Sequence, residues 1–239
     1  MSMLPDPMES EVPLSNPSLH ILLLEPFYGG SHQAFADGLK NHSRHQVEIL
    51  TMPDRFWKWR LRGAAIVLAD QINSLSVSPD AILASDMLSV ADLKAILGVN
   101  SPPVVLYMHE NQLTYPVPEG ERIDYQFAFT NVTSCLAADR IIFNSEFHLK
   151  TFLDALPELF KKMPDCRPKG IPKRIRAKSE VISPGCDFSA FSDRQNSAQS
   201  SKPITILWNH RWGFDKVPES FFEVIYRLQK NRLRFNLII

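Results

Sequence analysis

The chain has 239 residues, of which 44% are hydrophobic and 22% are charged, with 26 Lys and Arg balancing 26 Asp and Glu. Such a composition is ordinary for a globular protein and leaves room for one large domain or two smaller ones. Because the formal net charge is zero, no global field would draw the chain to a nucleic acid or an anionic membrane. A local patch must therefore hold any such partner.

The cysteines and the N-terminal residues bear on the cellular setting. Cys135, Cys166 and Cys186 are odd in number and far apart, which argues against a disulfide framework and a Cys-x-x-Cys metal site. We therefore expect a reducing, cytoplasmic setting. Four prolines and three acidic residues interrupt residues 1–18, so we expect a disordered tail there rather than a secretory signal peptide. No apolar run approaches membrane-spanning length, and no membrane partner is expected.

Strands and helices alternate from residue 19 onward. The apolar run at residues 21–24 predicts a buried central strand. The turn at Gly29 and Gly30 serves either as a loop hinge or as a place where a ligand approaches bare backbone amides. Ser31 is expected to cap a helix over residues 33–41. Further strands are predicted at 46–50, 81–84, 103–108 and 140–143, with helices ending near 75 and covering 90–97, 123–138 and 146–156. This alternation predicts an α/β fold with a parallel sheet and helices on both faces.

The composition changes after residue 160. Residues 161–178 form a basic, proline-rich loop, which is either a solvated charge run or a track for an RNA backbone. A brief strand at Val181 and Ile182 and a Ser- and Gln-rich stretch follow. We predict an N-terminal Rossmann-like domain at residues 19–187, a linker at 188–202 and a second such domain beginning at 203. Its predicted elements are a strand at 204–208, a loop, a helix at 218–229 and a strand at 235–239. That strand would be an exposed edge, so we expect the chain to be part of a longer protein.

Two groups of polar residues follow predicted strands. His109, Glu110, Asn111 and Gln112 come directly after the strand at 103–108. A lone histidine is usually structural, but four consecutive hydrogen-bonding side chains indicate a polar site of the kind that recognises sugars. In the second domain, Arg211 and Lys216 lie in the loop after the first strand, which Trp208 and Trp212 make more apolar than a plain solvent face. These cations are either solvated surface charges or a grip on a diphosphate whose charge grows as a bond breaks.

A third motif interleaves cations with aromatic rings. Residues 55–62 include Arg55, Trp57, Trp59 and Arg60. The combination suits an unstacked RNA base and its phosphates. The alternative is a helix start whose tryptophans are core residues, and we expect one tryptophan in the core and the other in contact with the partner.

Four segments taken together resemble the tRNA-queuosine α-mannosyltransferase family. They are residues 25–32 (Glu-Pro-Phe-Tyr-Gly-Gly-Ser-His), 55–63, 109–116 and 208–216. The resemblance implies the GT-B architecture, in which two Rossmann-like domains face each other. It also implies retaining transfer of mannose from GDP-mannose to queuosine in tRNA, without a metal or other cofactor.

The resemblance also implies roles for residues. His109 would contact the transferred mannose and Glu110 would shape the catalytic pocket, with no general base assigned. The donor would be held by Gly29, Gly30, Arg211 and Lys216, and the acceptor by His32, Arg55, Trp57, Trp59, Arg60, Asn111 and Gln112. Two departures stand out: Gly213 occupies a position where we expect an acidic residue, and the acidic donor motif of related enzymes would come later than Ile239. We therefore expect weak or no transferase activity from these residues alone.

Other functions stay open at this point. The chain could be a non-catalytic tRNA-binding or regulatory fragment, or a GT-B transferase acting on another acceptor, such as a lipid or a polysaccharide. An NAD-dependent oxidoreductase is the least favoured, because the chain lacks the Gly-x-Gly-x-x-Gly fingerprint.

Overall fold

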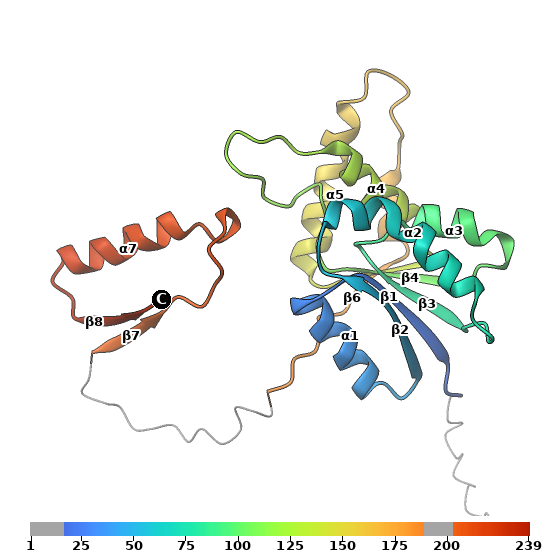
Figure 1. The fold of residues 1–239 in the computed structure, drawn as a ribbon. Helices are drawn as coiled ribbons and strands as arrows, with labels where there is room; N and C mark the ends of the chain where they lie inside the picture. The colour runs from blue at the N-terminus through green and yellow to red at the C-terminus, as the bar shows by residue number, and fades with distance from the viewer. Residues whose placement is uncertain (1–16, 189–202) are drawn as a thin grey trace, which may run out of the picture.

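The computed structural model describes residues 17–188 and 203–239 (Figure 1). The tail expected at 1–18 and the linker expected at 188–202 lie almost entirely outside these residues. The predicted domain limits stay a prediction.

Six parallel strands form one sheet in the order β2-β1-β3-β4-β5-β6. They are β1 (His20–Tyr28), β2 (Gln46–Pro53), β3 (Ala81–Ser85), β4 (Val104–Met108), β5 (Arg140–Phe143) and β6 (Ser179–Val181). Leu22 of β1 lies opposite Ile82 of β3, and Ile82 lies opposite Val104 of β4. These three side chains are fully buried, as a central parallel strand requires. The predicted α/β fold with a parallel sheet is confirmed.

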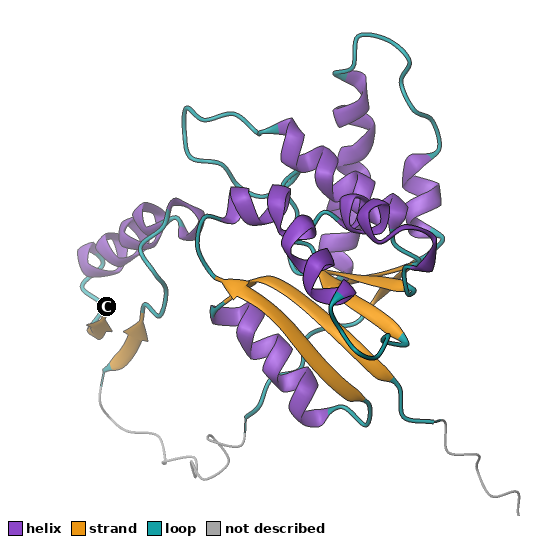
Figure 2. Cartoon of the chain, turned by 45° about the vertical axis from the view of Figure 1, so that its right-hand side comes forward, coloured by secondary structure: helices purple, strands orange, loops and turns teal. Residues whose placement is uncertain are grey.

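Helices cover both faces of the sheet, but unequally (Figure 2). On one face lie α2 (Trp57–Asn73), α3 (Val90–Leu97) with the short η1 (Gly98–Asn100), α4 (Tyr125–Ala137), α5 (Glu146–Lys161) and α6 (Ile171–Arg176). They share the main hydrophobic core with the sheet. On the other face, α1 (Gly30–His42) packs Ala36 against Leu23 and Val47 in a smaller cluster.

Two sequence expectations about helix ends are wrong. Helix α1 begins at Gly30 with Gly29 as its N-cap, so Ser31 does not cap it. Helix α5 continues through Pro157 to Lys161. An interior proline costs a helix roughly 3 kcal/mol, and here the burial of Leu156, Leu159 and Phe160 outweighs that cost.

The basic stretch at 161–178 is not a loop throughout. It contains α6, whose Ile171 and Ile175 are buried in the main core. These two isoleucines are spaced by four residues, which is the helical signal that the surrounding charges obscured.

A second α/β unit follows residue 203. It contains β7 (Ile204–Leu207), η3 (Phe214–Lys216), α7 (Pro218–Lys230) and β8 (Phe235–Ile238). Strands β7 and β8 pair in parallel, with Ile204 opposite Phe235, and α7 connects them (Figure 1). The predicted strand-helix-strand order is confirmed.

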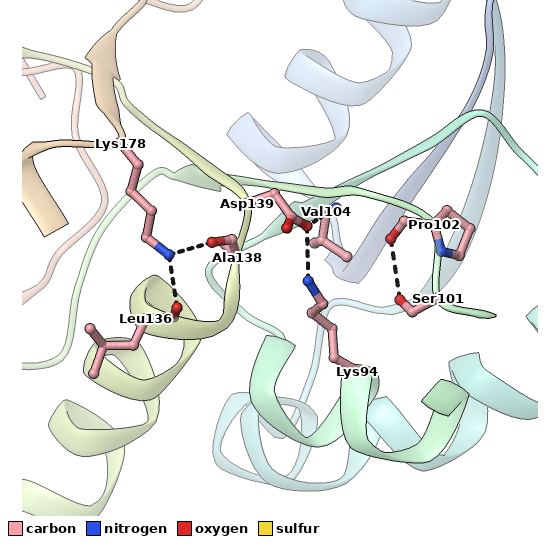
Figure 3. Close-up of polar contacts among 8 residues, drawn as sticks. All are labelled: Lys94, Ser101, Pro102, Val104, Leu136, Ala138, Asp139 and Lys178. Carbon is pink, nitrogen blue, oxygen red and sulfur yellow. Dashed lines mark hydrogen bonds and ion pairs between the residues drawn. The ribbon is translucent and has the colours of Figure 1, made fainter. Parts of the chain in front are cut away.

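Two charged side chains fix the end of the sheet opposite the site (Figure 3). The Lys178 ammonium donates to the carbonyl of Leu136 at 2.8 Å and to that of Ala138, so it caps the C-terminus of α4. The Asp139 carboxylate accepts from the Val104 amide at 2.7 Å and from the Lys94 ammonium at 2.9 Å. These contacts hold β4 in register with its neighbours, and β4 carries the polar residues of the site at its other end.

Among the helices of the described segments, none has the length and hydropathy that crossing a bilayer would require.

Candidate active site

The site begins at the carboxyl ends of β1 and β3. Glu25 lies in the C-terminal half of β1 and is buried. Its carboxylate accepts from Ser85 Oγ at 3.1 Å and from the amide of Phe27 at 2.9 Å. Its other oxygen lies 3.0 Å from Nδ1 of His32, which comes from the first turn of α1. Parallel strands bring their carboxyl ends to one edge, which explains why these distant residues meet.

The His32 imidazole carries a positive charge. Burial alone would lower its pKa, but the hydrogen bond and charge of Glu25, with Asp86 and Glu110 nearby, raise the pKa to about 9. His32 is therefore an imidazolium at neutral pH. Asp86 lies fully buried at the end of β3, and burial raises the pKa of its carboxyl. Asp86 was not among the predicted site residues, because a single acidic residue after a buried strand is too common a signal to single out.

His109 ends β4 beside His32. The two ring centroids are 4.3 Å apart, and the His109 ring also packs on Phe35 and Tyr107. Its amide donates to Asp86 at 2.8 Å. Burial and the positive charge of His32 lower the pKa of His109 to about 3, so its ring is neutral. Within the described residues its buried Nε2 has no hydrogen-bond partner, which is uncommon for a buried polar atom and singles out this nitrogen.

A cavity of about 880 Å³ opens against this cluster. Its walls include the predicted residues Gly29, Gly30, His32, Trp57, Glu110, Gln112, Arg211 and Lys216. Burial raises the pKa of the Glu110 carboxyl, which accepts from the Gln112 amide at 3.2 Å. The cavity therefore joins the strand ends of the first sheet to the Arg211 loop of the second unit.

The two glycines of the turn meet different requirements. Gly29 is extended, and a Cβ there would lie 2.0 Å from Oδ2 of Asp54, so the side chain of Asp54 would have to move. Gly30 has a φ of +53° with open space around it. A residue with a Cβ would be strained at Gly30. The first amides of α1, which begins here, have no carbonyl partner within the helix. The turn thus connects β1 to α1 and also places backbone amides at the cavity.

In the loop after β7, two cationic side chains pair with one carboxylate. Oδ2 of Asp215 lies 2.9 Å from the Arg211 guanidinium and 3.3 Å from the Lys216 ammonium. A Cβ on Gly213 would lie 2.6 Å from Oδ1 of Asp215 and 2.8 Å from Arg211. Glycine therefore lets this group close up, and Asp215 supplies an acidic residue two positions after the glycine.

The sequence comparisons agree with this geometry. A family model described as tRNA-queuosine alpha-mannosyltransferase N-terminal matches residues 20–186. A curated Drosophila melanogaster protein named tRNA-queuosine alpha-mannosyltransferase is 34% identical over 229 residues, covering 92% of this chain and 60% of that protein. The chain belongs to the tRNA-queuosine alpha-mannosyltransferase family. It thus spans less than two thirds of the length of this family member.

The family motif at residues 55–62 forms the start of α2. Trp57 is partly buried, lies 5.1 Å from the ring of Phe127 and lines the cavity, whereas Trp59 is 77% exposed. The expectation that one tryptophan lies in the core is wrong, because Trp57 is only partly buried at the wall of the cavity and Trp59 is exposed. Arg60 donates to the Pro53 carbonyl at 3.2 Å. Arg55 is exposed at the turn before the helix, outside the lining of the cavity.

Asn111 points away from the large cavity. Its side chain accepts from the amides of Leu113 and Thr114 and lies 2.9 Å from Nε2 of His148. It lines a smaller cavity of about 220 Å³, together with His109, whereas Glu110 lines both cavities. Asn111 thus shapes the loop formed by residues 109–112. Its role toward the acceptor stays a prediction.

One cluster of the site has the composition of a metal site. Donor atoms of Glu25, His32 and His109 lie within 4.8 Å of one another. A metal would have to displace the proton that Glu25 holds on His32, whose pKa is about 9. The donor set therefore favours the ion pair at neutral pH, and the expectation of a metal-free reaction stays a prediction.

Proposed function

We propose that this chain binds queuosine-containing tRNA and GDP-mannose in the 880 Å³ cavity, for a retaining transfer of mannose to queuosine. The observation that carries the proposal is the composition of the cavity. Polar strand ends of the first sheet form one wall and the cations Arg211 and Lys216 form part of another. A GT-B arrangement and a cytoplasmic setting belong to the proposal, the latter supported by the exposed, unpaired thiols of Cys166 and Cys186.

The donor diphosphate is assigned to the cationic side of the cavity. As the bond between the sugar and the diphosphate breaks, negative charge grows on the leaving oxygens. Arg211, Lys216 and the His32 imidazolium would stabilise it, and the amides at the start of α1 would donate hydrogen bonds. His109, which lines the smaller cavity, would contact the mannose where Glu110 borders both cavities, since its neutral ring keeps an unpartnered Nε2.

The acceptor base is assigned to the aromatic and polar side. Trp57, Phe127 and Tyr115 line the cavity beside Glu110 and Gln112. Aromatic faces suit an unstacked base, and carboxyl and amide groups suit its hydroxyls. No protein side chain is assigned as general base, because in a retaining reaction of this type the leaving phosphate can take the acceptor proton.

Two measurements test the acceptor assignment. Filter binding would compare one tRNA species with and without queuosine, and mass spectrometry of digested nucleosides would detect a hexose on queuosine after incubation with GDP-mannose and excess protein. We expect tighter binding of the queuosine form and weak transfer. Binding without any transfer would favour a non-catalytic tRNA-binding fragment. Equal binding of both tRNA forms, with no transfer, would contradict the proposal.

The donor assignment is tested with a matched pair of lysines. We expect Lys216→Ala to abolish GDP-mannose binding in calorimetry, whereas Lys230→Ala, an exposed lysine at the end of α7, should leave it unchanged. Equal affinities in the two variants would contradict the placement of the diphosphate.

A further inference from the structure

The segment 161–178 concentrates positive charge in a chain whose net charge is zero. It holds eight Lys and Arg residues and one acidic residue, Asp165, an excess of seven positive charges. Nothing in the cavity chemistry described above uses this segment.

The segment is ordered by packing on the core. Ile171 and Ile175 of α6 are buried, so the intervening residues Lys173 and Arg174 face outward and are exposed. Three prolines at 164, 168 and 172 restrict the backbone further. A surface that is already ordered loses less conformational entropy on binding than a flexible tail does.

Several cations of this segment already have partners. Lys161 pairs with Glu158 at 2.6 Å, Arg167 donates to the Met163 carbonyl at 2.9 Å, and Lys178 caps α4. Within the described segments, the exposed side chains of Lys169, Lys173 and Arg174 have no ion pair or hydrogen bond. These three are free to bind an anionic partner.

This surface continues to the rim of the main cavity. The Lys162 ammonium lies 5.3 Å from the ring centroid of Tyr125, and Tyr125 directly follows Ile123 and Asp124, which line the cavity. Figure 1 shows the end of α5, where this segment begins, near the start of α4. On the cavity side, the Lys58 ammonium lies 5.6 Å from the ring centroid of Trp57. A polyanion whose base enters the cavity could therefore extend over the basic segment.

We propose that residues 161–176 bind the phosphate backbone of the tRNA while its queuosine occupies the cavity. The proposal rests on the proposed function and adds the surface that holds the rest of the acceptor. RNA fits this surface better than a membrane does, because none of the large hydrophobic side chains in this fully described segment is exposed, and membrane-docking surfaces insert such residues. Phosphate contacts by Lys and Arg give affinity that falls with salt concentration.

The test compares two double variants, each of which removes two positive charges. Lys169→Ala with Arg174→Ala removes two free cations of the surface. Lys40→Ala with Arg44→Ala removes an exposed lysine and arginine at the end of α1, on the opposite face of the sheet. Filter binding of queuosine-containing tRNA would be measured from 50 to 200 mM salt. Equilibrium dialysis would measure binding of the free queuosine nucleoside, and circular dichroism would compare the folding of the variants.

The first double variant should lower the slope of log affinity against log salt by about 1.5 and weaken tRNA binding about tenfold at low salt. The second should leave both values unchanged, and neither should alter nucleoside binding. Unchanged tRNA binding in the first variant, with normal nucleoside binding, would overturn this surface and leave the proposed function intact. Binding to anionic vesicles would be measured as well. If the first variant loses vesicle binding but keeps tRNA binding, the assignment of this surface to tRNA is overturned in favour of a membrane. If unmodified protein binds neither tRNA nor nucleoside, the proposed function itself fails.

Discussion

The imidazole rings of His32 and His109 lie 4.3 Å apart and hold opposite protonation states. Glu25 and nearby carboxyl groups raise the pKa of His32 to about 9, whereas burial and the His32 charge lower that of His109 to about 3. One ring is therefore a cation and the other is neutral over the whole range near neutral pH. This pairing of a cation with an uncharged donor or acceptor suits a site that takes both a diphosphate and a sugar.

The raised pKa of His32 predicts a loss of stability at alkaline pH. An unfolded histidine titrates near 6.5, so its contribution is fully present below 6.5 and is lost as the pH rises through about 9. We expect the free energy of unfolding to fall by on the order of 1–3 kcal/mol more in the wild type than in His32→Gln over this range. Urea denaturation between pH 6 and 10 measures it. Parallel curves for the two proteins would contradict the charged His32.

The lowered pKa of His109 predicts a loss of stability at acid pH. The unfolded ring gains a proton below about 6.5 while the folded ring stays neutral down to about 3, so the free energy of unfolding falls as the pH is lowered. His109→Gln should flatten this part of the curve. His148 has a pKa lowered to about 4 by burial and serves as a comparison, since His148→Gln should flatten the same range. An unchanged acid flank in His109→Gln would contradict the neutral ring.

Three glycines of α1 and its N-cap provide a stability series. Gly30→Ala should destabilise by about 1 kcal/mol, because alanine is strained at a φ of +53°. Gly38→Ala, with open space inside the same helix, should stabilise by roughly 0.5–1 kcal/mol. Gly29→Ala must displace Asp54 and should destabilise. Denaturant midpoints measure all three, and equal effects at Gly30 and Gly38 would refute the assigned backbone conformation.

The two tryptophans of α2 should differ in what they bind. Trp57→Ala should weaken binding of the queuosine nucleoside by about 1–3 kcal/mol if the base stacks on this ring. Trp59 is 77% exposed and lies outside the cavity lining, so Trp59→Ala should weaken only the binding of whole tRNA. Equilibrium dialysis with the nucleoside and filter binding with tRNA separate the two effects. Normal nucleoside binding by Trp57→Ala would remove this tryptophan from the acceptor site.

The sequence predicts the frame of the site better than the direction of its side chains. Buried apolar runs such as residues 21–24 and 103–108 locate the strands, and the right-handed crossover rule brings their carboxyl ends together. His109 and Glu110 could therefore be predicted at this edge of the sheet, where Glu110 lines the main cavity and His109 lines the smaller one. Asn111 could not be oriented in advance, because its direction depends on His148, which α5 brings in from 37 residues away.

Helix ends were set by packing that local patterns do not contain. Pro157 and the charges of 161–178 both indicate that a helix should end, yet buried leucines and isoleucines prolong α5 and form α6. Asp86 follows β3 as the polar residues of the site follow β4, but a single acidic residue is too common a signal to single out. Its importance depends on three-dimensional contacts with His109 and His32.

The central claim is that one cavity takes queuosine and the donor diphosphate together. Equilibrium dialysis of the free queuosine nucleoside, with and without saturating GDP-mannose, tests it most directly for the wild type and Arg211→Ala. We predict that GDP-mannose tightens nucleoside binding to the wild type, since a donor held beside the acceptor adds contacts to it, and has no effect on Arg211→Ala, which would not hold the donor. Nucleoside affinity that is identical with and without GDP-mannose in the wild type would contradict the claim.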